Sequence, residues 1–319
     1  MNRYSPDPAF STDVREGLSA SPRRLSSKWF YDKRGDGLFQ AIMAMPEYYL
    51  TGCEEEIYRS AGPQLLEAIG PNAFDLVELG AGDGTKTQYL VEQFLAAGAE
   101  FTYRPVDISA NALAVLGELI GRRWPDLPFA PERGDYFVAL ERLLAKRSGT
   151  KPNLVLFPGA NIGNFTPAAA ADFLKRLRGY LRPGDLLLTG FDLKKDPAVV
   201  LAAYNDPAGH TAAFNLNLLT RINRELGGNF DPENWLHWET YDPVSGAARS
   251  YIVARAACTV TLADHETSYH FEPAEAIEVE ISQKYSRREI RDLAAATGYT
   301  FLRSLEDHRG YFTDSLWRV

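Results

Sequence analysis

The chain has 319 residues, of which 45% are hydrophobic and 24% charged, so it can form one or two hydrophobic cores of an ordinary globular protein. Its net charge of −8 disfavours nucleic-acid and membrane-surface partners. No apolar run approaches the roughly 18 residues of a membrane helix, and the N-terminus lacks the apolar region of a secretory signal.

Two cysteines, Cys53 and Cys258, are too few for a disulfide framework and indicate a reducing compartment. The five histidines show no metal-ligand spacing. We therefore expect a cytoplasmic monomer with a small-molecule substrate and no metal.

Residues 1–70 precede the first expected strand and are rich in aromatic residues in helical or turn spacing. Residues 54–69 have the apolar spacing of an amphipathic helix, whereas residues 46–50 interrupt helical spacing. Two interpretations stand. The segment is either a helical lid that simply packs on the protein, or a lid whose Tyr31 and Tyr48 face a ligand.

The next segment has the pattern of a strand, a tight turn and a helix start. An apolar run at residues 75–79 is followed by Gly80, Gly82 and Gly84. These glycines permit positive φ and close approach of a ligand, and the N–H groups at the helix start would face a polar or anionic group. The spacing differs from the dinucleotide motif GxGxxG and fits better the first loop of S-adenosylmethionine (SAM) methyltransferases. Taken alone, a structural glycine turn is an equal alternative.

The second expected strand, residues 101–106, ends at Asp107. A carboxylate in this place can accept hydrogen bonds from both hydroxyls of a ribose. The alternative is that Asp107 caps the helix expected at residues 109–121. The glycine loop and the acid together favour a nucleoside cofactor.

Strands and helices alternate from residue 75 to residue 192, which predicts a parallel sheet with helices on both faces. We expect strands at 75–79, 101–106, about 127–130, 153–158 and 185–191, and helices at about 85–97, 109–121, 136–147 and 167–181. Asp135 and Tyr136 follow the third strand, where a carboxylate could meet an adenine amine. A plain helix cap is the alternative for Asp135. Asn161 and Asn164 follow the fourth strand and suggest amide donors close to a ligand.

The alternation stops after Asp192. A helix at residues 211–226 and four short alternating stretches predict a small antiparallel sheet. A helix at 287–297 and strands at 299–305 and 312–319 return to the main pattern. The predicted organisation has four segments: an N-terminal helical lid (1–70), a SAM-binding core (71–192), an inserted substrate-binding lobe (193–284) and a completion of the core sheet (285–319).

The chain resembles, over nearly its whole length, the L-histidine Nα-methyltransferases of ergothioneine biosynthesis. The resemblance implies a doubly wound, Rossmann-like class I SAM methyltransferase domain with an inserted α+β lobe. It also implies transfer of methyl groups to the α-amino group of L-histidine, giving Nα-trimethylhistidine (hercynine). The family-specific pieces occur in order and include Trp29-Phe30-Tyr31-Asp32, Pro46-Glu47-Tyr48-Tyr49, Glu78-Leu79-Gly80-Ala81-Gly82, Pro105-Val106-Asp107, Ile162-Gly163-Asn164 and Glu280-Ile281-Ser282-Gln283-Lys284.

The resemblance further implies roles for single residues. The residues expected to contact the cofactor are Tyr31, Gly80, Lys86, Asp107, Asp135 and Tyr136. The residues expected to hold the substrate are Tyr48, Asn164, Tyr204, Glu280 and Ser282. Asn164 and Tyr204 would take the substrate carboxylate, and Glu280 and Ser282, two apart on one face of a strand, the imidazole. Tyr31 and Asn164 are the implied catalytic residues.

Two positions depart from the family. The histidine enzymes generally read Gly-Ser-Thr-Ile-Gly-Asn after the fourth strand, where this chain has Asn161 as the third residue. They usually carry a methionine in the inserted lobe, where this chain has Ser250. A related methyltransferase of another amino acid or small amine is therefore the alternative. A non-catalytic cofactor-binding protein is the alternative outside the class, and a dinucleotide-dependent oxidoreductase lacks its motif.

Overall fold

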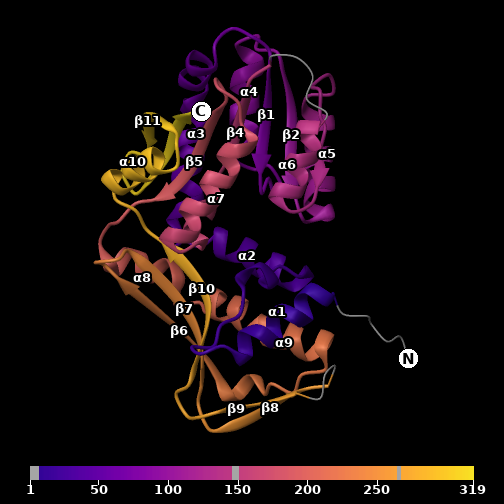
Figure 1. Ribbon diagram of the computed structural model, residues 1–319, viewed down its shortest axis with the longest axis vertical. Coiled ribbons are helices and arrows are strands. Elements are labelled where there is room, and N and C mark those ends of the chain that lie inside the picture. The colour runs from indigo at the N-terminus through magenta and orange to yellow at the C-terminus, as the bar shows by residue number, and fades with distance from the viewer. Residues whose placement is uncertain (1–6, 146–150, 264–266) are drawn as a thin grey trace. The chain divides into compact units, whose positions relative to one another are not determined.

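The chain forms two compact units in the computed structural model, which describes residues 7–145, 151–263 and 267–319 (Figure 1). The core unit comprises Leu50–Lys194 and Gln283–Val319, and the lobe unit comprises Met1–Tyr49 and Lys195–Ser282. The sequence-based expectation for the inserted lobe was residues 193–284, and Lys195–Ser282 forms one unit together with Met1–Tyr49. The N-terminal boundary differs from the predicted residue 70, because residues 50–69 pack in the core unit.

A seven-stranded sheet lies at the centre of the core unit, with the order β11-β12-β5-β4-β1-β2-β3. The strands β1 to β5 are parallel, whereas β12 runs antiparallel to both β5 and β11. Strands β1 and β4 are neighbours, and the connections that follow them run in opposite directions across the sheet. In such sheets, ligands bind at the carboxyl ends of the two strands where this reversal occurs. The strands are β1 (Phe74–Leu79), β2 (Phe101–Asp107), β3 (Glu132–Arg133), β4 (Asn153–Phe157), β5 (Leu186–Asp192), β11 (Thr300–Glu306) and β12 (Phe312–Arg318).

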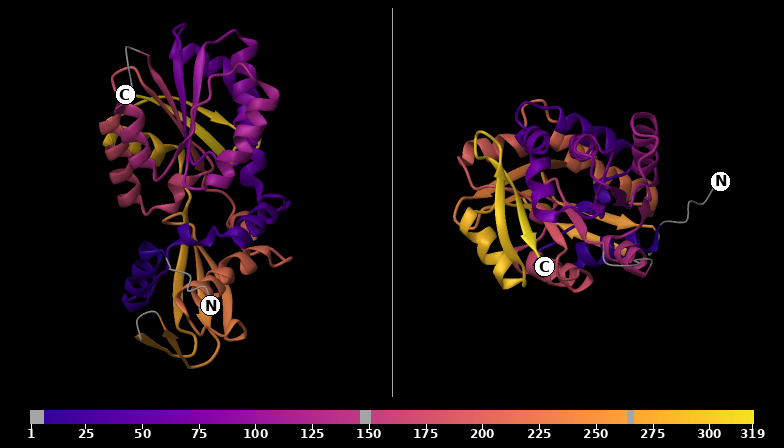
Figure 2. Two further views of the ribbon diagram at one scale, coloured as in Figure 1. Left: turned by 90° about the vertical axis from the view of Figure 1, so that its right-hand side faces the viewer. Right: turned by 90° about the horizontal axis from the view of Figure 1, so that it is seen from above.

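Helices cover both faces of this sheet, as the left panel of Figure 2 shows. One face packs its apolar side chains against α6, α7 and α10, and Phe74 on the other face packs edge-on against Phe94 of α4. The doubly wound α/β fold is thereby confirmed. The core helices are α3 (Tyr49–Ile69), α4 (Gln88–Ala96), α5 (Ala110–Arg123), α6 (Tyr136–Ala145), η2 (Asn161–Asn164), α7 (Pro167–Tyr180) and α10 (Arg287–Ala296). The end of the helix predicted at 136–147 lies outside the described residues.

Two elements of the core unit differ in position from the sequence-based expectation, and the one small antiparallel sheet expected after residue 192 is two separate sheets. The third strand is not at 127–130 but at Glu132–Arg133, and Phe129 forms only an isolated bridge to Tyr103. Pro128 and Pro131 flank that bridge, and a residue without an N–H group cannot continue a ladder. Helix α3 begins at Tyr49 instead of residue 54, because burial of Tyr49 and Leu50 stabilises its first turn.

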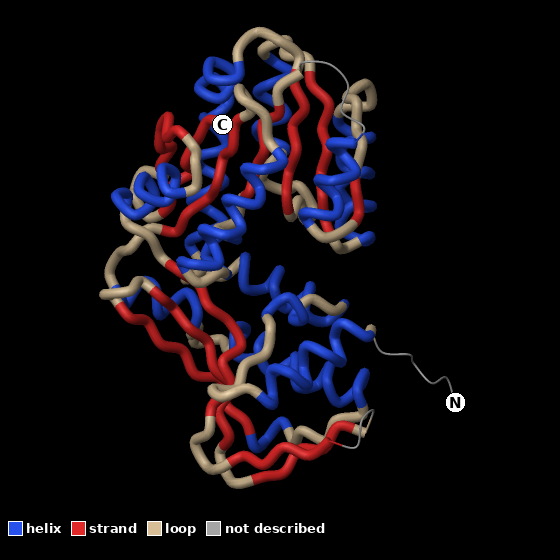
Figure 3. The backbone as a smooth tube through the Cα atoms, viewed as in Figure 1, coloured by secondary structure: helices blue, strands red, loops and turns tan. Residues whose placement is uncertain are grey.

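The lobe unit combines helices with two small sheets, as the colours of Figure 3 distinguish. Its larger sheet has the order β10-β7-β6, and β8 pairs with β9 in a separate hairpin. The lobe helices are α1 (Pro8–Ser19), η1 (Ser27–Phe30), α2 (Lys33–Met43), α8 (Pro197–Tyr204), α9 (His210–Leu226) and η3 (Pro232–Asn234). The lobe strands are β6 (Trp235–Asp242), β7 (Ala247–Ala254), β8 (Cys258–Leu262), β9 (Thr267–Phe271) and β10 (Ala276–Gln283). Among the described residues, none of the helices combines the length and the apolar character needed to span a membrane.

Candidate active site

The glycine loop after β1 is hydrogen-bonded to the end of the neighbouring strand β2. Gly80 and Gly82 have φ of +78° and +56°, conformations that favour glycine. The N–H groups of Gly80 and Ala81 donate to Val106 O at 2.8 and 3.2 Å. Helix α4 begins only at Gln88, whose N–H donates to Gly84 O at 3.1 Å. The N–H groups of Gly80, Ala81 and Gln88 thus have acceptors within the loop and its neighbouring strand.

Asp107 ends β2 and fastens this loop. Its Oδ2 accepts from the Gly82 N–H at 2.9 Å, and its Oδ1 accepts from the Ser109 N–H at 2.8 Å. The N-cap of α5 is Ser109, whose hydroxyl accepts from Ala112 N, so the capping alternative for Asp107 is excluded. Each carboxylate oxygen retains the capacity for a further hydrogen bond, as recognition of two ribose hydroxyls requires.

Tyr136 reaches the glycine loop from the start of α6. A methyl group on Gly80 would lie 3.0 Å from the Tyr136 hydroxyl and 3.4 Å from Asn161 Nδ2. Burial and the negative charges of Asp107 and Asp135 raise the pKa of Tyr136, so its hydroxyl stays a neutral donor. Asp135 accepts from Phe137 N at 3.0 Å and thus caps α6, the simpler of its two interpretations.

The turn after β4 lies beside the same loop. Gly159 and Ala160 both have positive φ, and η2 follows. A methyl group on Gly159 would lie 3.6 Å from Asn161 Nδ2 and 3.7 Å from Lys86 Nζ. The Asn161 amide is therefore placed between the two glycine turns, while Asn164 at the end of η2 is exposed. This edge of β1 and β4 brings together Gly80, Lys86, Tyr136 and Asn161.

Two buried acids of the core unit were missed in the sequence. Glu54 on α3 pairs with Lys86 and accepts from Gly159 N at 2.7 Å. Glu78 on β1 accepts from Thr87 Oγ1 at 2.5 Å, and burial raises its pKa to about 7. Glu54 lies in a run of three glutamates, which has the appearance of a solvated helix face.

Three of the predicted substrate residues lie together in the lobe unit. The hydroxyl oxygens of Tyr204 and Ser282 are 2.7 Å apart, and the rings of Tyr48 and Tyr204 are 6.3 Å apart. Phe39 lies 5.5 Å from Tyr31 and 6.4 Å from Tyr48 between ring centroids. Tyr31 is 43% exposed, so this aromatic cluster presents a ring to its surroundings.

A histidine that the sequence did not single out fixes Tyr204. His237 Nε2 lies 3.0 Å from the Tyr204 carbonyl oxygen, and Asn215 Nδ2 lies 2.9 Å from His237 Nδ1. The Asn215 amide donates to Nδ1, so the neutral imidazole donates from Nε2 to Tyr204. Burial lowers the pKa of His237, which favours this neutral form.

Ser250, the departure from the family in the lobe, has a specific partner. Its hydroxyl donates to Glu239 Oε2 at 2.6 Å, and both side chains are buried on adjacent strands β7 and β6. Glu280 is half-buried on β10, two residues before Ser282. The lobe unit thus contains Tyr31, Tyr48, Tyr204, Glu280 and Ser282. The core unit contains Asn164, which was predicted to bind the substrate, and all the predicted cofactor residues except Tyr31.

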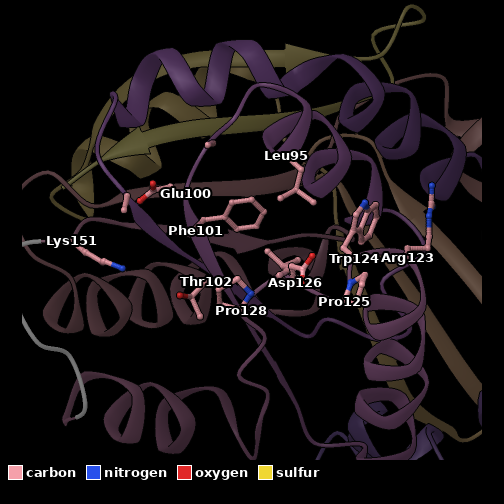
Figure 4. Close-up of a pocket in the computed structure, with 13 residues that line it drawn as sticks. Leu95, Glu100, Phe101, Thr102, Arg123, Trp124, Pro125, Asp126, Pro128 and Lys151 are labelled. Carbon is pink, nitrogen blue, oxygen red and sulfur yellow. The ribbon is translucent and has the colours of Figure 1, made fainter.

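A separate hollow of about 570 Å³ lies elsewhere in the core unit (Figure 4). Phe101, at the amino end of β2, and Trp124, at the end of α5, line it. Asp107 lies at the other end of the same strand, its carboxyl end. None of the predicted site residues lines this hollow, so it is not the candidate cofactor site.

Comparison with known proteins extends the resemblance found in the sequence. The family model described as "Histidine-specific methyltransferase, SAM-dependent" matches residues 10–319. Histidine N-alpha-methyltransferase of Mycolicibacterium smegmatis is 38% identical over 87% of this chain and 84% of its own length. The protein of the same name from Mycobacterium tuberculosis is 35% identical over 97% and 94%. Ergothioneine biosynthesis protein 1 of Schizosaccharomyces pombe is 33% identical over 87% of this chain but only 37% of its own length.

The family match covers almost every described element, including the glycine loop, Asp107, η2 and the lobe strands. The chain therefore belongs to the family of histidine-specific, SAM-dependent methyltransferases.

Proposed function

We propose that the chain transfers methyl groups from SAM to the α-amino nitrogen of L-histidine and produces hercynine for ergothioneine biosynthesis. The observation that carries this proposal is the match over residues 10–319 together with two relatives named for that activity. Its immediate product, after one, two or three transfers, is a histidine with an increasingly substituted amine.

The residues of the core unit fit SAM. Gly80 leaves room beside the Tyr136 hydroxyl, Asp107 can accept ribose hydroxyls, and the Lys86 ammonium is a partner for a carboxylate. The exposed side chain of Ile108 follows Asp107 and offers an apolar surface to a base. When bound, SAM supplies a methyl group activated by a sulfonium sulfur.

The chain's contribution to catalysis is to bind and orient the amino acid. Before each transfer the ammonium loses a proton to water, and in the transfer a nitrogen–carbon bond forms while the sulfur–carbon bond of the methyl donor breaks. Tyr31 is the proposed residue beside the amine, and Asn164 and Tyr204 are the proposed partners of the carboxylate. Near-attack geometry of amine and methyl carbon is the main requirement of such a displacement.

Glu280 and Ser282 are the proposed partners of the imidazole. A carboxylate and a hydroxyl satisfy the donor and acceptor nitrogens of the neutral ring. The second candidate is a methyltransferase of another amino acid or small amine. The Ser250–Glu239 hydrogen bond favours it, since a polar pair stands where the histidine enzymes usually have a methionine.

A cytoplasmic location remains our proposal and is supported by two cysteines that are both free thiols. A monomer also remains our proposal. The activity itself is tested by incubating the protein with SAM and single amino acids, and reading the products by mass spectrometry. We expect histidine to gain three methyl groups, all on the α-nitrogen by fragmentation. Methylation confined to the imidazole, or to another amino acid, would contradict the proposal.

A further inference from the structure

Glu54 joins two loops of the core unit that are far apart in sequence. It lies in the second turn of α3, and its side chain is only 1% exposed. Its Oε1 accepts from the Gly159 N–H at 2.7 Å, in the turn after β4. Its Oε2 pairs with Lys86, which follows the glycine loop after β1. One buried carboxylate therefore spans the two turns that flank the candidate cofactor site.

The sheet is shaped to admit this carboxylate. A methyl group on Gly190 of β5 would lie 2.7 Å from Glu54 Oε1 and 2.9 Å from the Phe312 ring. Contacts below 3.0 Å are not tolerated, so only glycine at position 190 lets Glu54 lie against the strand. The Lys86 side chain keeps 23% of its surface exposed, so Glu54 does not enclose it completely.

A second acid stands beside the pair. Asp314 of β12 lies opposite Gly190 in the strand register and is fully buried. Among the described residues, neither of its carboxylate oxygens has a hydrogen-bond partner, and the same holds for the hydroxyl of Tyr58, one turn beyond Glu54. Burial and the negative charge of Glu54 raise the pKa of Asp314, and the charge of Lys86 opposes this. The ion pair of Lys86 is with Glu54, whose carboxylate contacts the ammonium directly.

We propose that Glu54 is a positioning residue of the cofactor site, which fixes the Lys86 ammonium and the Gly159 turn relative to each other. The proposal rests on the proposed function only in placing SAM at these two turns. An ammonium without Glu54 would move among several positions, and the turn after β4 would lose the acceptor of its N–H group. Both changes would weaken the binding of SAM.

The test is a double-mutant cycle of Glu54→Gln and Lys86→Gln, with the dissociation constant of SAM measured by calorimetry. Losing a hydrogen bond to a charged group costs about tenfold or more in affinity, and we expect this for each single variant. Glu54→Gln keeps an amide oxygen that can accept from the Gly159 N–H but loses the charge that holds Lys86. The double variant should therefore bind SAM about as weakly as Lys86→Gln alone. The Michaelis constant for histidine at saturating SAM should change less than the dissociation constant of SAM in Glu54→Gln.

Glu55→Gln is the matched control, since the Glu55 carboxylate contacts Arg59 and Tyr89 and not the site. If Glu54→Gln does not fold, Glu54→Asp retains the charge but is too short to reach both partners, and it should bind SAM more weakly than wild type. Wild-type affinity in a folded Glu54 variant, or fully additive effects in the cycle, would overturn the positioning role. Failure of the wild-type protein to bind SAM would instead count against the proposed function.

Discussion

The hydroxyl oxygens of Tyr204 and Ser282 lie 2.7 Å apart and link α8 to β10 within the lobe unit. Both are proposed substrate contacts, so each hydroxyl limits the orientation of the other. We expect Tyr204→Phe to raise the Michaelis constant for histidine roughly two- to tenfold, the worth of one neutral hydrogen bond.

The dissociation constant of SAM should be unchanged in Tyr204→Phe, because Tyr204 belongs to the lobe unit and the loop of Asp107 to the core unit. Steady-state kinetics and calorimetry on one preparation separate the two effects. A defect in SAM binding as large as the defect in histidine use would count against the substrate role of Tyr204.

Asp107 holds the glycine loop and is the proposed ribose partner. Asp107→Ala should weaken SAM binding about tenfold or more, since hydrogen bonds to a charged group are worth roughly 1.5–3 kcal/mol. It should also lower the melting temperature without SAM, because the N–H groups of Gly82 and Ser109 lose their acceptor. A folded Asp107→Ala variant with wild-type affinity for SAM, measured by calorimetry, would remove Asp107 from the cofactor site.

His237 makes the lobe sensitive to acid. Its pKa is lowered by burial, so below its ordinary value near 6.5 the unfolded chain binds a proton that the folded chain does not. Its contribution to stability is therefore complete above about pH 6.5 and is lost as the pH falls below this value. The expected slope approaches about 1.4 kcal/mol per pH unit.

Urea unfolding at pH 5, 6 and 7 measures this slope in wild type, in His237→Gln and in His308→Gln as the control. His308 is exposed and pairs with Glu56, so His308→Gln should lose stability between pH 6.5 and 5 as wild type does. In His237→Gln the free energy of unfolding should depend less steeply on pH in this range. Equal slopes in wild type and His237→Gln would show that His237 does not titrate as its burial requires.

Ser250 is smaller than the methionine that the histidine enzymes usually have in this place, and it also donates a hydrogen bond to Glu239. Ser250→Ala should destabilise the chain by about 1–3 kcal/mol, because the buried carboxylate loses a hydrogen-bond donor. Ser250→Met should cost at least as much, since a longer side chain must also fit the same strand. Denaturant unfolding tests both variants, and a Ser250→Ala variant as stable as wild type would mean that the pair contributes nothing.

The parts of the fold with local patterns could be predicted from the sequence. The apolar run before Gly80 and the run before Asp107 are complete strands, and both end where the sequence placed them. The third strand was misplaced because Pro128 and Pro131 exclude a ladder in an otherwise apolar stretch. An apolar pattern indicates which side chains are buried, but a proline, which has no N–H group, cannot donate a hydrogen bond to a neighbouring strand.

The positioning residues could not be predicted in the same way. Glu54 bonds Gly159 across 105 positions of sequence, and His237 bonds Tyr204 across 33. Each is one polar residue in an element of ordinary composition, and its role arises only when distant elements meet. The resemblance found Tyr204 and Ser282 but not the side chain that holds Tyr204.

The central claim is that L-histidine is the amino acid methylated, and that Glu280 selects it. A substrate without imidazole nitrogens would not make the proposed hydrogen bond to the Glu280 carboxylate, which is worth about 1–3 kcal/mol. The looser packing expected at Ser250 would reduce this discrimination but not reverse it.

The most direct measurement is a competition among histidine, tryptophan, tyrosine and lysine, with SAM limiting, for wild type and Glu280→Ala. Methylated products are quantified by mass spectrometry. We predict that wild type methylates histidine first and that Glu280→Ala loses about tenfold or more of this preference. A wild-type protein that prefers another amino acid, or a Glu280→Ala variant with unchanged preference, would contradict the account.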